Sequence, residues 1–128
     1  MDNLDLISKK LEELDEPILK DNPNRFTLFP INYPDLWQFY QTHVATFWTS
    51  GDIDFEADRD DWDKLDSHEK HFILNVLAFF AGSDGIVLEN IMGNFSLEVQ
   101  VPEARSFYSI QGAIETIHSE VYSLLIET

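Results

Sequence analysis

Cysteine is absent from the 128-residue sequence, and its absence excludes several kinds of site. Without thiols the chain has no disulfide, no thiolate metal ligand and no cysteine nucleophile. Basic residues are also scarce, since eight Lys and Arg stand against 24 Asp and Glu and give a formal charge of -16. Proteins that bind nucleic acid or an anionic membrane surface use Lys and Arg against the phosphates. The composition therefore argues against both partners and favours a solvated acidic surface.

Long hydrophobic runs are absent as well. The longest apolar stretch covers residues 76–82, whereas a membrane-spanning helix needs about 20 such residues. The start of the sequence, Met1–Asp5, is acidic and has no hydrophobic signal core. Hydrophobic residues make up 44% of the chain and aromatic residues 13%, which is enough for one packed domain. We therefore expect a cytoplasmic protein with neither a leader nor a membrane span.

The hydrophobic pattern predicts an all-α protein in two parts. Residues 1–25 are polar and acidic, and we expect a surface tail with at most one short helix. Residues 26–128 carry the apolar positions of a helical domain, at helical spacing. No segment shows the alternation of a strand.

Capping signals divide the second part into helices. Pro34 can open a helix that runs to about Trp48, after an extended segment over residues 26–33. Residues 49–65 read as an acidic loop, which lacks the glycine and the final glutamate of a calcium loop. Asp66 and Glu69 form the pattern of a capping box before a long helix that reaches about Phe95. Pro102 opens a last helix, apolar over most of its circumference, that we expect to be buried among other helices.

Three residues of the last helix share one face and carry the clearest chemical signal. Glu115 and His118 lie one turn apart, and Tyr122 lies one turn beyond His118. Asp84 falls on the apolar stripe of the preceding helix, where a charge needs a partner. A divalent cation bound by Asp84, Glu115 and His118 would satisfy all three. Carboxylate and imidazole ligands suit iron and manganese, and zinc less specifically.

The sequence resembles the N-terminal part of the small, radical-generating subunit of class I ribonucleotide reductases. The resemblance covers nearly everything from Glu16 onward and is closest to the eukaryotic and viral branch. The matching segments include Asn-Pro-Asn-Arg-Phe at 22–26, Tyr-Pro-Asp-Leu-Trp at 33–37, Phe-Trp-Thr at 47–49, and residues 71–81, 83–87, 98–105 and 117–126.

This resemblance implies a fold, a cofactor and roles for five residues. The fold is a ferritin-like helical bundle, and the cofactor is dinuclear iron, with manganese or a mixed centre left open. Asp84 and His118 serve one metal, and Glu115 bridges the two. Tyr122 is the residue that is oxidised to a stable radical. Trp48 stands at the inner end of the radical-transfer route to the large catalytic subunit, where ribonucleotides are reduced to deoxyribonucleotides.

The sequence contains only half of the ligand set that the resemblance implies. The family supplies two more Glu and one more His, and no second Glu-x-x-His occurs here. The last residues, Leu125–Thr128, continue the helical pattern without a glycine cap. We expect a fragment, the product of a split or truncated gene, or a chain completed by a complementary C-terminal chain. The resemblance also implies a homodimer of the small subunit. Alone, it should expose apolar surface and aggregate, oligomerise or fold with a partner.

Two kinds of alternative function accompany this interpretation. Iron-storing oxidases and fatty-acyl desaturases share the bundle but usually place glutamate as the first ligand, where this sequence has Asp84. A metal-free structural or interaction module derived from such a subunit stays open, because half of the ligands are missing.

Overall fold

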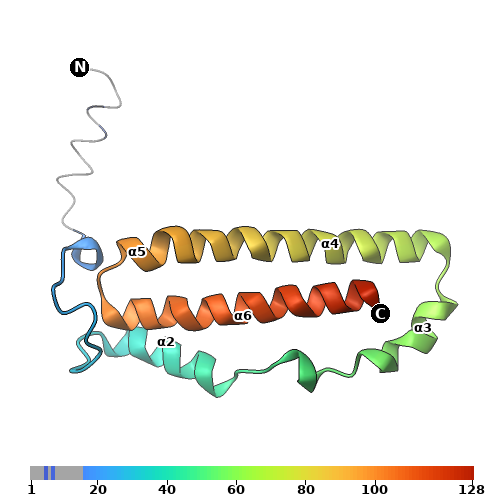
Figure 1. The fold of residues 1–128 in the computed structure, drawn as a ribbon, viewed down its shortest axis with the longest axis horizontal. Coiled ribbons are helices and arrows are strands. Elements are labelled where there is room, and N and C mark those ends of the chain that lie inside the picture. The colour runs from blue at the N-terminus through green and yellow to red at the C-terminus, as the bar shows by residue number, and fades with distance from the viewer. Residues whose placement is uncertain (1–4, 6, 8–15) are drawn as a thin grey trace.

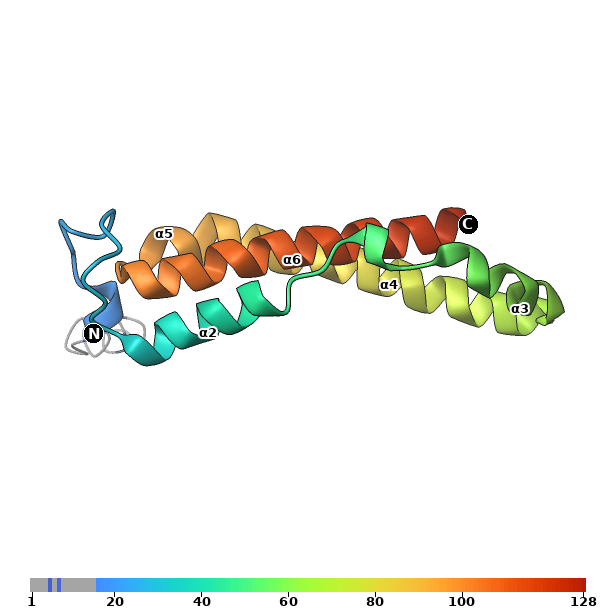
Figure 2. The ribbon, with the colours of Figure 1, turned by 90° about the horizontal axis from the view of Figure 1, so that it is seen from below.

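Three long helices dominate the computed structural model, which describes residues 5, 7 and 16–128 (Figure 1). They are α2 (Pro34–Ala45), α4 (Ser67–Asn90) and α6 (Pro102–Glu127). α6 runs antiparallel to α4 along most of its length, and α2 packs against the N-terminal half of α6 from another side (Figures 1 and 2). The described residues contain no strand, so the all-α prediction is confirmed.

Short helical elements occupy the segment predicted as an acidic loop, and that prediction is wrong. The carboxylates themselves stabilise these turns, since Asp54 accepts a hydrogen bond from the backbone of Glu56 and Asp52 accepts one from the backbone of Thr49. The short elements among the described residues are η1 (Pro17–Leu19), η2 (Ser50–Asp52), η3 (Phe55–Asp58), α3 (Arg59–Lys64), the π-helical turn η4 (Ile91–Phe95) and α5 (Ser96–Glu98). The short helix expected in the N-terminal tail lies largely outside the described residues.

The predicted helix starts are confirmed, and two predicted ends shift. Asp66 caps α4, accepting bonds from His68 and Glu69 while the Glu69 carboxylate accepts from the Asp66 backbone. α4 ends at Asn90, and the wider π turn follows before Phe95 is reached. α2 stops at Ala45, three residues before the predicted end. The hydroxyl and the N–H of Thr46 both bond to the Thr42 carbonyl there.

The helical segment Ser67–Glu98 is long and apolar enough to cross a membrane by length and composition alone. The length of the longest apolar stretch did not predict this property. Gly, Ser and Asn interrupt the apolar stretch without making the helix strongly polar. A core helix of a water-soluble protein passes the same test, so one such helix is weak evidence for a membrane protein.

Apolar surface remains exposed along α4. Phe72, Phe79 and Ile86, spaced by seven residues, are 69%, 68% and 64% exposed. α6 is also less buried than predicted, because α4 and α2 cover only part of it and its buried residues are Glu103, Ala104, Gly112 and Val121. Exposed faces of this size fit the expectation that the chain associates with further protein, which stays a prediction.

The small core lies at the N-terminal end of α6, around Val99, Val101 and Ala104. Glu103, fully buried beside them, anchors the segment that leads into α2. Its Oε1 accepts hydrogen bonds from the backbone N–H of Asn32 at 2.6 Å and from that of Tyr33 at 3.1 Å. The carboxylate therefore ties α2 to α6 across about 70 residues of sequence.

Replacing Glu103 with Ala is expected to lower the free energy of unfolding by about 2 kcal/mol, because two backbone donors lose their acceptor. Urea unfolding followed by circular dichroism measures the change. Glu98→Ala removes an exposed carboxylate a few residues away and should cost less than about 0.5 kcal/mol. Equal stability of the two variants would contradict the anchoring role of Glu103.

Candidate metal centre

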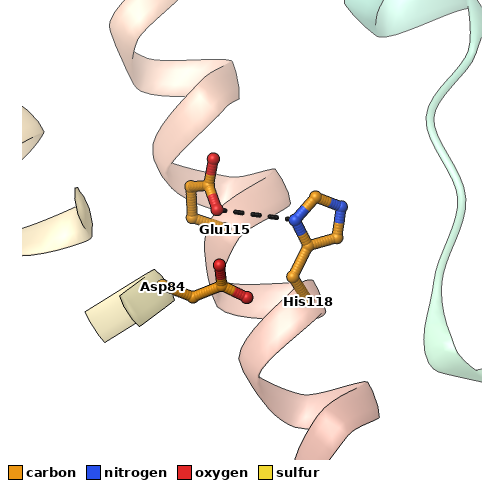
Figure 3. Close-up of side chains that lie close together, drawn as sticks. All are labelled: Asp84, Glu115 and His118. Carbon is orange, nitrogen blue, oxygen red and sulfur yellow. Dashed lines mark ion pairs between the residues drawn. The ribbon is translucent and has the colours of Figure 1, made fainter. Parts of the chain in front are cut away.

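Asp84, Glu115 and His118 come together between α4 and α6 (Figure 3). Asp84 projects from α4 toward Glu115 and His118 on α6, and one ligand atom of each residue lies within 4.8 Å of those of the others. All three are half-buried. Within residues 16–128, this is the one group of three or more carboxylate or imidazole side chains with such spacing. The proximity expected from the sequence is therefore present.

Helix geometry explains how the two halves of the group meet. Glu115 and His118 are one turn apart, and His118 Nδ1 lies 3.4 Å from Glu115 Oε2. One turn earlier, the buried Gly112 faces the end of α4 and the π turn η4, where an added Cβ would lie 3.5 Å from a Leu88 methyl carbon and 3.2 Å from Met92 Sδ. The absence of a side chain at Gly112 thus allows α4 close enough for Asp84 to reach the pair on α6.

Asp84 itself supplies the test of whether these residues fit a metal. Its Oδ2 is buried and has no hydrogen-bond partner among the described residues. A buried carboxylate oxygen without a partner is costly and calls for a ligand or a donor. Two carboxylates and one imidazole form a donor set that suits iron and manganese. The three residues therefore fit a divalent metal ion.

Two aromatic side chains adjoin the group. Tyr122 follows His118 by one turn, and its ring stacks on Phe80 of α4 with centroids 5.5 Å apart and planes at 21°. The Trp48 ring lies 5.7 Å from the His118 ring. Phe80 was not predicted to adjoin the site, although its position on the apolar stripe of α4, one turn before Asp84, could have indicated it.

The remaining histidines lie apart from this group. His68 and His71 are exposed in the first turns of α4. His43 is half-buried on α2, with its ring against Phe107 at 5.1 Å. In this structure the three histidines are therefore surface or packing residues.

A family model described as "Ribonucleotide reductase, small chain" matches residues 25–128. The chain belongs to this family. Curated relatives include ribonucleoside-diphosphate reductase small chains from Trypanosoma brucei brucei, 56% identical over 121 residues, and from Variola virus, 58% identical over 113 residues. The Trypanosoma match covers 94% of this chain and 36% of the relative, and the Variola match covers 88% and 35%.

A solved ribonucleotide reductase structure has the same fold. The Rnr4 homodimer from Saccharomyces cerevisiae matches with a TM-score of 0.84 and 39% identity, over 95% of this chain and 39% of that one. The expected membership of the ribonucleotide reductase small-chain family and the ferritin-like helical fold are confirmed. The chain spans about a third of the length of the curated relatives it matches.

Proposed function

We propose that this chain supplies one side of a dinuclear metal centre that generates a tyrosyl radical for the reduction of ribonucleotides to deoxyribonucleotides. The observation that carries the proposal is the convergence of Asp84, Glu115 and His118, with the Asp84 oxygen left without a partner. Asp84 and His118 would hold one metal, and Glu115 would bridge to the second. The remaining ligands, two Glu and one His, would come from sequence outside these 128 residues.

Tyr122 is the residue that would carry the radical. The metal centre, when bound, would supply the oxidising equivalent from O2, and Tyr122 would lose one electron and its phenolic proton. A phenoxyl radical persists where water and reductants are kept away. The Phe80 ring stacked on Tyr122 covers one face of the phenol. Phe80 would therefore shield that face of the ring from water.

Trp48 would connect the centre to the protein surface. Its indole lies against the imidazole of His118. Trp48 is part of the segment between α2 and η2. We assign it to the inner end of the route that carries the radical equivalent to the large catalytic subunit. On this account the functional protein is cytoplasmic and pairs as a small-subunit homodimer. In this proposal the helical domain over residues 26–128 would carry the metal ligands.

The competing function is a metal-free structural or interaction module. The exposed apolar side chains of α4 favour it to the extent that they indicate association with other protein. The two functions differ in one property, because only the first requires the Asp84 carboxylate to bind a cation.

Metal loading and turnover of a complemented protein separate these functions. The complementing segment is the part of the Trypanosoma brucei brucei small chain that this chain does not cover, and the two would be co-expressed. Ferrous iron and O2 are added, and bound metal and deoxynucleotide formation with a large subunit are measured. The proposal predicts two metal ions per complemented protein and product only with both chains. Correct assembly without bound metal would favour the inert module.

A further inference from the structure

Trp48 is held by the short segment between α2 and η2, which passes along α6. Trp48 lies outside regular structure, because α2 has already ended at Ala45 and η2 begins only at Ser50. Its distance from His118 is therefore set by the contacts of this segment rather than by a helix of its own. Figure 2 shows the segment after α2 passing along α6 before it reaches α3.

The turn that follows Trp48 is a compact unit. Asp52 Oδ2 accepts a hydrogen bond from the backbone N–H of Thr49 at 2.8 Å, and the Asp52 N–H bonds back to the Thr49 carbonyl at 3.0 Å. The Ile53 N–H bonds to the Ser50 carbonyl at 3.2 Å. Because these bonds fix the backbone directly after Trp48, a shift of the turn moves Trp48 with it.

One side chain fastens this turn to α6. Ser50 Oγ donates a hydrogen bond of 3.0 Å to Glu120 Oε1, across 70 residues of sequence. In the part of the chain that the structure describes, it is the one side-chain hydrogen bond between η2 and α6. Glu120 follows His118 by two residues on the same helix. The segment thus meets α6 at two points, through Trp48 at His118 and through Ser50 at Glu120.

We propose that Glu120 is a positioning residue that, through Ser50, holds Trp48 against His118. The inner end of the radical-transfer route is thereby kept in place. This inference rests on the proposed function for the role of Trp48, but the placement of Trp48 can be measured without any metal. Acceptance by a carboxylate strengthens the Ser50 hydrogen bond relative to a neutral acceptor. Loss of the acceptor releases the turn, and Trp48 then samples orientations away from the imidazole.

The test follows the indole N–H signals of Trp37, Trp48 and Trp62 by NMR in the complemented protein without metal. Single Trp→Phe variants assign the three signals. Glu120→Ala and Ser50→Ala should each shift or broaden the Trp48 signal and leave the other two in place. Glu120→Gln should largely preserve it, because the amide oxygen still accepts from Ser50. Glu127→Ala, an exposed acid on the same helix, is the matched control and should change nothing.

The functional arm uses the metal-loaded protein with a large subunit. Glu120→Ala should leave the tyrosyl radical yield unchanged and lower turnover by roughly five- to tenfold, the population shift that the loss of one hydrogen bond of ordinary net strength produces. An unmoved Trp48 signal in both Glu120→Ala and Ser50→Ala would overturn the inference, even where metal binding and radical formation succeed. If the Trp48 signal moves in these variants but the parent protein forms no radical, the positioning role of Glu120 is supported and the proposed function is rejected.

Discussion

Tyr122→Phe is expected to abolish the tyrosyl radical signal in the EPR spectrum of the complemented protein after addition of ferrous iron and O2. The substitution removes only the phenolic oxygen, so the stacked contact with Phe80 and the ligand group stay in place. The residual signal should be less than about a hundredth of the parent signal, because phenylalanine lacks the O–H that the phenol loses on oxidation. Bound metal should be unchanged.

Tyr108→Phe is the matched control for this experiment. Tyr108 lies on the same helix, and its ring stacks on Phe95 with centroids 5.7 Å apart and planes at 19°, much as Tyr122 stacks on Phe80. Its replacement should leave the radical signal intact. A signal that survives in Tyr122→Phe and disappears in Tyr108→Phe would place the radical on Tyr108 and contradict the role of Tyr122.

Removing a proposed ligand should have the second large effect. Asp84→Ala and His118→Ala should each weaken metal binding at least 100-fold, since even residues that only orient the ligands cost about 10- to 100-fold. Metal content after dialysis against a chelator measures the loss. His43→Ala removes a half-buried imidazole that packs on Phe107, and it should keep both metals.

The effect of Asp84→Ala on stability should depend on whether metal is bound, and this dependence distinguishes a metal ligand from a structural residue. Without metal, its buried Oδ2 has no partner, so Asp84→Ala should leave the free energy of unfolding unchanged or raise it by about 1 kcal/mol. With metal, the same substitution should be strongly destabilising, because the bound ion stabilises only the folded state. Destabilisation of equal size in both conditions would assign Asp84 a purely structural role.

The helices were predictable because their signals are local. Pro34 and Pro102 sit at the first positions of α2 and α6, and Asp66 with Glu69 forms the capping box that opens α4. The acidic stretch over residues 49–65 was wrongly predicted as a loop, because Asp is common both in loops and at helix caps. Which of the two forms depends on the neighbouring backbone.

The candidate site was predictable in part. Glu115 and His118 share a face by spacing alone, and a charge on the apolar stripe of α4 indicated Asp84. The contacts made through space were not predictable from periodicity. The stacking of Phe80 on Tyr122 and the hydrogen bond from Ser50 to Glu120 depend on the register between separate elements. Gly112 allows α6 to approach Leu88 and Met92 closely, and a lone glycine inside a helix does not reveal its neighbour.

Anomalous diffraction at the iron edge from crystals of the complemented, iron-loaded protein locates the metal ions relative to the three proposed ligands. We expect two anomalous peaks, the first within bonding distance of Asp84, Glu115 and His118, with Glu115 also reaching the second. Peaks at another place, or an iron-free centre in which Asp84 Oδ2 is hydrogen-bonded to protein, would contradict the proposed metal centre.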